Sequence, residues 1–314
     1  MEAIIWRVQQ YGGWVAGCIG AILAWFAGFD LIEHFIHDQD RLSLTANIYV
    51  VVSAAAVVIF TAIRQWSTIR KERYANITPI IHQLIHQIRD LNTFVTLNEP
   101  VGGSYADYKR FTGDCKMFFG RILDQLNTIF SSLTSTHCRT SIKLTYGSDP
   151  LYVYTLARDQ GSRQKCLKMD NKRVETNHDP LTQNLQFAKL FSDSDESWHY
   201  ICNDLTRAQD FQCTSTTAYA PDYAMRLADG RRRWLARKWP LPYKSTIACV
   251  IRQGPIDLCQ DVKTEVLGFL TVDSESRGVF EERWDVQIMF AVADALYGPV
   301  RAYLDAQNRA PPEP

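Results

Sequence analysis

The densest run of chemically capable side chains lies between residues 231 and 239. It reads RRRWLARKW and holds five cations and two tryptophans in nine residues. Guanidinium groups bind phosphate oxygens with two parallel hydrogen bonds, and indole rings stack on nucleobases. The alternative is a solvated helix face, or a contact with anionic lipid. We take six residues as a candidate site for a nucleotide or nucleic acid: Arg231, Arg232, Arg233, Trp234, Arg237 and Lys238.

Patterns that would indicate catalysis or metal binding are absent from the sequence. It contains no phosphate-binding glycine loop of NTPases, no GxSxG, no HExxH and no dinucleotide fingerprint. Its eight cysteines form no CxxC pair, and the His82 and His86 pair lacks a third ligand. The 34 basic and 34 acidic residues cancel, so whole-chain charge favours no polyanionic partner. We expect a protein that is not an enzyme and that holds no metal and no cofactor.

Two apolar stretches near the N-terminus predict a transmembrane hairpin over residues 1–64. Residues 12–32 and 44–63 each approach the ~20 residues that cross the hydrocarbon of a bilayer. The loop between them is mainly acidic, whereas four basic residues follow the second stretch, which places both termini in the cytoplasm. A cleavable signal peptide is the alternative for the first stretch. The lipid bilayer is therefore an expected partner, and the bacterial inner membrane is the expected location.

Small residues recur at every fourth position of the first stretch. They form a face on which another helix can approach closely, either the second span or another copy of the chain. This transmembrane packing face consists of Ala16, Gly20, Ala24 and Gly28.

A helical connector is expected over residues 65–103. Thr78 followed by Pro79 is typical of a helix start. Apolar residues then recur alternately four and three positions apart, which favours a short coiled coil and a homo-oligomer. A helix that lies on its own soluble domain is the alternative. The connector seam consists of Ile77, Ile81, Leu84, Ile88, Leu91 and Val95.

The soluble domain is expected over residues 104–306, with a disordered tail at 307–314. Long amphipathic helices fit residues 105–133 and about 281–305. The order helix, hairpin, variable helical insert, hairpin, helix predicts an α+β fold with one sheet face covered by the first and last helices. The strands of the two hairpins are expected at residues 138–146, 151–159, 245–253 and 266–274.

The C-terminal part of this domain resembles the GAF family. The run EVLGFLTVDSESRGVF, followed by a helix that carries Ala293 and Asp294, is similar to the penultimate strand, the loop with a phenylalanine and the helix of a GAF domain. The best match covers residues 241–305. The resemblance implies a GAF-like antiparallel sheet that is covered by helices and that senses a small molecule or mediates dimerisation. It implies no particular ligand, because no cysteine or histidine is assignable to a chromophore or haem.

These features lead to one expected function and one alternative. Two spans joined to a cytoplasmic sensor resemble the two-helix membrane effectors of bacterial anti-phage systems that cyclic nucleotides or retrons control. We expect a membrane effector that alters inner-membrane integrity when its GAF-like domain meets a trigger, such as a nucleotide or a complex of nucleic acid and protein. The alternative is a membrane-anchored regulatory module that controls a cytoplasmic partner without permeabilising the membrane.

Overall fold

The computed structural model describes residues 39–168, 178–192, 198–208, 211–214, 239, 241–253 and 265–313. The chain divides into two units, Met1–Asn76 and Ile77–Pro314. Two predictions therefore lie outside the described residues: the first apolar stretch with its packing face (Ala16, Gly20, Ala24 and Gly28), and the basic run from Arg231 to Lys238.

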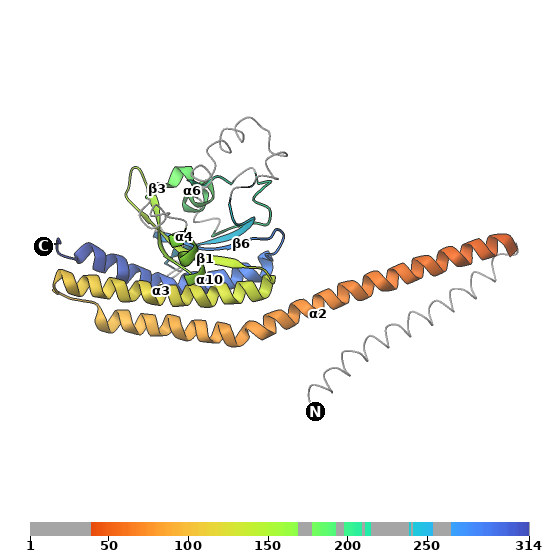
Figure 1. The fold of residues 1–314 in the computed structure, drawn as a ribbon, viewed down its shortest axis with the longest axis horizontal. Helices are drawn as coiled ribbons and strands as arrows, with labels where there is room; N and C mark the ends of the chain where they lie inside the picture. The colour runs from red at the N-terminus through yellow and green to blue at the C-terminus, as the bar shows by residue number, and fades with distance from the viewer. Residues whose placement is uncertain are drawn as a thin grey trace, which may run out of the picture. The chain divides into compact units, whose positions relative to one another are not determined.

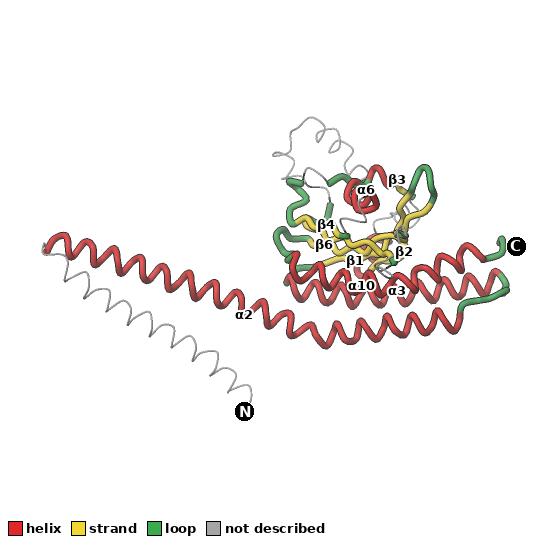
Figure 2. The backbone as a smooth tube through the Cα atoms, turned by 180° about the vertical axis from the view of Figure 1, so that it is seen from behind, coloured by secondary structure: helices red, strands yellow, loops and turns green. Residues whose placement is uncertain are grey.

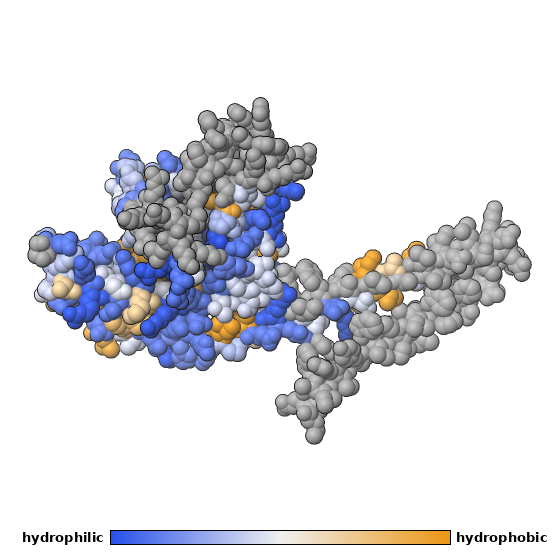
Figure 3. Space-filling view, viewed as in Figure 1, coloured by the Kyte–Doolittle hydropathy of each residue, from blue (hydrophilic) through white to orange (hydrophobic). Residues whose placement is uncertain are grey.

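Helix α2 (Gln39–Asn98) holds the second apolar stretch and the connector. Among the described helices, none combines the length and the hydropathy needed to cross a membrane. Its N-terminal part nevertheless exposes Val52, Ile59 and Phe60, and Figure 3 shows hydrophobic surface on this part of the helix. Pro79 lies inside α2, so the helix start predicted at Thr78 and Pro79 is wrong. Burial of the apolar side chains that follow Pro79 stabilises the helix. This stabilisation offsets the loss of the one backbone hydrogen bond that proline removes.

The centre of the second unit is a six-stranded sheet in the order β3-β2-β1-β6-β5-β4. All neighbouring strands are antiparallel. The four central strands are those that alternation predicted, whereas the two short edge strands were not predicted. The strands are β1 (Cys138–Tyr146), β2 (Tyr152–Arg158), β3 (Asp179–Pro180), β4 (His199–Cys202), β5 (Ser245–Arg252) and β6 (Val266–Ser274).

Helices α3 (Tyr105–Thr134) and α10 (Glu282–Arg309) cover one face of the sheet, as predicted (Figures 1 and 2). Helix α3 packs on β1 and β2, and α10 packs mainly on β5. A capping box starts α3, since Ser104 and Asp107 satisfy each other's backbone N–H groups. The apolar face of α3 includes Phe119, Leu126 and Phe130, all fully buried. These contacts form the main core of the unit.

The connector seam packs within the chain. Five of its six residues are buried, and Ile81 is partly buried. On the same helix, the Phe94 ring stacks on Phe111 of α3 with the ring centroids 5.7 Å apart. From residue 77 onward, α2 lies beside α3 and α10 as a second helical layer (Figures 1 and 2). The structure thus places the seam on its own domain, the alternative to the expected contact between two copies.

The opposite face of the sheet is covered by short elements. They include η1 (Leu181–Gln183) and α6 (Leu185–Ser192), whereas α4 (Gln160–Lys168) follows β2 and its first backbone N–H donates to Asp124 of α3. Figure 1 shows α6 on the side of the sheet away from α3 and α10. Apolar side chains of α6 and of the loops around residues 205, 211 and 241 complete a second core there. This second face, with its partial cover, holds the candidate site.

Candidate functional site

Alternation along the strands separates the two sheet faces by side-chain chemistry. On β1, Thr140 points to the helical layer and donates a hydrogen bond to the Leu123 carbonyl of α3 at 2.8 Å. Its neighbours Arg139, Ser141 and Lys143 therefore point to the opposite face. The pairing of β1 with β6 places Phe269, Thr271 and Asp273 on that same face. We call it the distal face.

One half of the distal face is apolar. Phe187 of α6 stacks on Phe269 of β6, with the ring centroids 4.7 Å apart. Val153 of β2, Val250 of β5 and Leu190 of α6 belong to the same buried cluster. This half is an ordinary hydrophobic core that holds α6 on the sheet.

The other half of the distal face holds two cations that converge on one neutral hydroxyl. Lys143 Nζ donates to Thr155 Oγ1 at 3.3 Å, and Arg158 Nη2 donates to the same oxygen at 3.2 Å. The register of β1 with β2 places Thr155 opposite Lys143, and a bulge in this pairing brings Arg158 opposite Ser141. All three side chains are partly buried. We call Lys143, Thr155 and Arg158 the cation pair site.

The acidic residues of the distal face are engaged elsewhere. Asp273 Oδ1 accepts a hydrogen bond of 2.6 Å from Thr246 Oγ1 of β5. Glu275 pairs with Arg139, with 2.8 Å between carboxylate and guanidinium. Burial raises the pKa of Asp273, opposed by the Thr246 hydrogen bond and by the positive charges of Lys143, Arg158 and Arg139. Asp179 of β3 pairs with Val153 and lies on the same face, so three carboxylates stand beside the three cations Arg139, Lys143 and Arg158.

The hydrogen-bond donors of the cation pair site leave room for a bound anion as acceptor. Within the described part of the chain, no carboxylate forms an ion pair with Lys143 or Arg158. The Arg158 Nε atom is buried and has no hydrogen-bond partner. Burial, and then the neighbouring Arg158 charge, lower the pKa of Lys143 to about 8. A carboxylate or phosphate between the two cations would satisfy both donors.

Replacing Lys143 by methionine should stabilise the chain at neutral pH. The folded pKa of about 8 lies below the unfolded value of 10.5, so the unfolded chain binds more protons between these pH values. The charged, partly buried Lys143 therefore lowers the free energy of unfolding of the wild-type chain below pH 8. This free energy rises as the pH increases from 8 to 10.5. We expect Lys143→Met to raise the free energy of unfolding by on the order of 1 kcal/mol at pH 7, and by less at pH 10.5. Thermal unfolding at both pH values measures this. A variant that is less stable at both would contradict it.

The sequence predictions and the site coincide only in part. The basic run of Arg231, Arg232, Arg233, Trp234, Arg237 and Lys238 lies outside the described residues. The six candidate residues include neither Lys143 nor Arg158. A polar residue at every second position of a hairpin is typical of a solvated sheet face. The pattern that could have indicated Lys143 and Arg158 is the polar residue Thr155 between them, because three polar side chains then meet on two adjacent strands.

The described cysteines give little support to thiol chemistry. Cys115, Cys138, Cys213 and Cys249 are buried, and Cys202 is partly buried. Burial raises the pKa of Cys115 to about 12, and it also raises the pKa values of Cys138 and Cys249. Since the thiolate is the nucleophile, these three residues are poor nucleophiles at neutral pH.

The chain order of the elements and their arrangement in layers identify the fold class. An initial helix, a hairpin, an insert, a second hairpin and a final helix form one antiparallel sheet, and the two helices lie on one face. This α+β arrangement fits the GAF-like fold that the sequence resemblance implies. Described residues of the insert, among them Phe187 and Leu190 of α6, lie on the distal face, and the Lys143 amine lies 5.7 Å from the centroid of the Phe187 ring.

No family model and no curated protein matches the chain. Similar solved structures include the GAF domain of an Acinetobacter phosphoenolpyruvate-protein phosphotransferase (11% identity, 72% of this chain and 98% of that chain covered, TM-score 0.38). A phycoerythrobilin-bound GAF domain from a cyanobacterial phytochrome has 11% identity, coverage of 73% and 96%, and a TM-score of 0.37. A type II free methionine-R-sulfoxide reductase from Thermoplasma acidophilum has 10% identity, coverage of 60% and 97%, and a TM-score of 0.37.

Proposed function

We propose that this chain is a sensor without enzymatic activity, whose GAF-like unit binds a small anion at the cation pair site. The observation that carries the proposal is the convergence of Lys143 Nζ and Arg158 Nη2 on the single neutral oxygen Thr155 Oγ1. Two partly buried cations on one hydroxyl cost free energy in the absence of an anion. Such a cost is typical of a binding site and is offset when a ligand binds.

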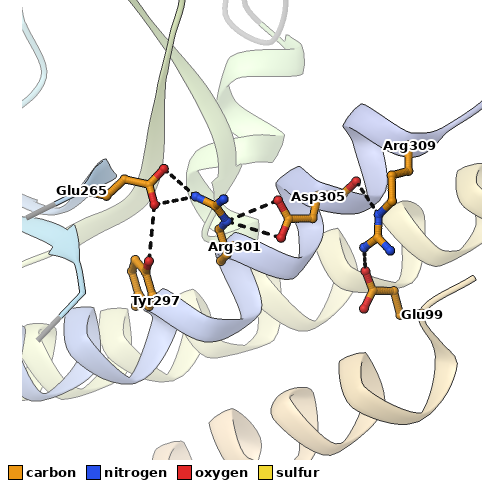
Figure 4. Close-up of polar contacts among 6 residues, drawn as sticks. All are labelled: Glu99, Glu265, Tyr297, Arg301, Asp305 and Arg309. Atoms are coloured by element: carbon orange, nitrogen blue, oxygen red, sulfur yellow. Dashed lines mark hydrogen bonds and ion pairs between the residues drawn. The ribbon is translucent and has the colours of Figure 1, made fainter. Parts of the chain in front are cut away.

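A polar network offers a route from this site to helix α2 (Figure 4). Glu265 directly precedes β6, the strand that carries Asp273, and it pairs with Arg301 of α10. Two turns further along α10, Arg309 pairs with Glu99, the residue that follows α2. Arg301 also contacts Asp305 at 3.2 Å, and Arg309 Nε donates to the Asp305 carbonyl at 3.1 Å. A shift of β6 would thus act on α10 and, through Arg309, on the end of α2.

The output that we propose is the N-terminal hydrophobic segment, as a membrane effector. Its support is the composition of residues 12–32 and 44–63 together with the exposed Val52, Ile59 and Phe60. Anti-phage defence is one use of such an effector. The second candidate is a membrane-anchored module that controls a cytoplasmic partner. The continuity of α2 from residue 39 to residue 98 favours the effector, because one helix joins the sensor unit to the hydrophobic segment.

Anion binding is testable with inorganic phosphate as the probe. We expect the thermal midpoint of the full chain to rise when phosphate replaces chloride at constant ionic strength, because a ligand of the folded state stabilises it. Lys143→Met and Arg158→Met should each abolish this rise. Lys244→Met is the matched control, since Lys244 is an exposed lysine. An equal rise in the wild-type chain and both site variants would contradict the anion site.

Membrane activity separates the effector from the regulatory module. We expect overproduction of the wild-type chain in bacteria to collapse the membrane potential and to admit an impermeant dye. A chain that lacks the packing face, with Gly20 and Gly28 replaced by leucine, should lose this effect if close helix packing is required. An unchanged potential during overproduction would favour the regulatory module.

A further inference from the structure

We propose that Lys143 forms a reversible imine with a small oxo acid, a ligand that carries both a carbonyl group and a carboxylate. The inference rests on the proposed anion site and names its ligand class. Arg158 binds the carboxylate, and the Lys143 amine attacks the carbonyl carbon.

The first support is the position of the Lys143 amine. Its Nζ atom lies 3.3 Å from Thr155 Oγ1 and 5.7 Å from the centroid of the Phe187 ring. One side of the amine is therefore polar and the other is apolar. Within the described residues, no carboxylate forms an ion pair with it. An amine at the border of an apolar cluster is arranged as a nucleophile and not as a structural cation.

The second support is the set of charged groups that face Lys143. Arg158 of β2 disfavours the charged amine, whereas Asp273 of β6, Asp179 of β3 and Cys213 favour it. Burial outweighs the three favourable groups and keeps the pKa of Lys143 at about 8. The neutral fraction near pH 7.5 is then on the order of 10²-fold larger than that of an exposed lysine. Only the neutral amine has a lone pair with which to attack a carbonyl carbon.

The third support is the neighbouring guanidinium. Arg158 Nη2 donates to the same Thr155 oxygen as Lys143 Nζ, and the buried Arg158 Nε atom lacks an acceptor. A carboxylate that accepts from Arg158 would therefore lie beside the amine. In a 2-oxo acid the carbonyl carbon is bonded directly to the carboxylate, so such a ligand can bind to Arg158 while its carbonyl meets Lys143. A simple anion would accept from both cations without forming a covalent bond, and a simple aldehyde would react with Lys143 without using Arg158.

The proposed step is balanced without any further reactant. The Nζ lone pair forms a C–N bond to the carbonyl carbon, and one amine proton moves to the carbonyl oxygen. The resulting carbinolamine loses that oxygen as water, together with the second amine proton. A C=N bond remains between Lys143 and the ligand. Water reverses the reaction, so the adduct reports the ligand concentration.

The test uses the full chain with glyoxylate as the probe and cyanoborohydride to trap the imine, followed by peptide mass spectrometry. At pH 7.5 we expect Lys143 to be carboxymethylated at least about tenfold faster than Lys116 and Lys244. Labelling of Lys143 at the rate of these two lysines would overturn the proposal. Lactate, an anion without a carbonyl group, should slow the labelling of Lys143 and leave that of Lys244 unchanged.

The matched variant is Arg158→Met. It should slow the labelling of Lys143 by glyoxylate at least about tenfold and leave its labelling by acetaldehyde, which has no carboxylate, within about twofold. An equal loss with both probes would overturn the role of Arg158. If phosphate stabilises the chain through Lys143 and Arg158 but glyoxylate forms no adduct, the imine is wrong and the anion site stands. If neither response occurs, both proposals fail.

Discussion

Replacing Gly268 by alanine is expected to lower the free energy of unfolding by about 3 kcal/mol or more. Gly268 of β6 pairs with Leu144 of β1 at the centre of the sheet. A Cβ atom on Gly268 would lie 2.0 Å from the Lys143 carbonyl oxygen and 2.9 Å from the Leu144 Cα atom. Both are backbone atoms, so the clash is relieved only if β1 moves away from β6. The same movement would displace Lys143 from the cation pair site.

Chemical unfolding of the full chain measures this effect, and Gly113→Ala is the matched control. Gly113 lies on the exposed side of α3, where an added Cβ would meet no atom within 4 Å. There we expect no loss of stability, or a gain of up to ~1 kcal/mol, because alanine favours a helix over glycine. Equal stabilities for Gly268→Ala and Gly113→Ala would contradict the pairing of β1 with β6 as described.

Replacing Leu91 by alanine is expected to lower the free energy of unfolding by about 2–5 kcal/mol. Leu91 lies in the connector seam and is 0% exposed. Its side chain is enclosed by the chain's own helices, so its removal leaves a cavity within one molecule. The loss of stability should therefore be the same at low and at high protein concentration.

Leu97→Ala is the control, since Leu97 lies on the same helix and is 75% exposed. We expect its effect to stay within about 0.5 kcal/mol. A different outcome would support the seam as a contact between copies: Leu91→Ala would then dissociate an oligomer, and its effect would grow on dilution. Sedimentation of both variants alongside unfolding distinguishes the two cases.

Periodicity predicted the elements that the second unit is built from. The strand-like runs at residues 138–146 and 266–274 and the apolar face from Tyr108 to Leu133 were sufficient, because most positions of both strands and one face of the helix are buried. Strands β3 and β4 were not predicted. They have two and four residues, and their strand conformation depends on pairing with β2 and β5. Local sequence carries little signal for such pairing.

The site was harder to predict than the fold for a related reason. Lys143 and Arg158 occupy the polar positions of an alternating hairpin, and such positions face water unless another segment covers them. The cover comes from residues 181–213 and 241–243, far along the chain from β1 and β2. At Pro79, in contrast, the local sequence strongly predicted a helix start, and this prediction is wrong. The helix continues through Pro79, and the buried Leu84 and Leu91 that follow it stabilise this continuation.

The most direct test asks whether anion binding at the cation pair site acts on α2. It measures hydrogen exchange of the amides in residues 77–98 of α2 with and without phosphate. In the wild-type chain we expect phosphate to change the exchange rates both in β1 and β2 and in this part of α2. In Lys143→Met and Arg158→Met we expect no change in either region. Altered exchange in β1 and β2 with unchanged exchange in α2 would contradict the coupling of the site to α2. The same response in the wild-type chain and both variants would contradict the site itself.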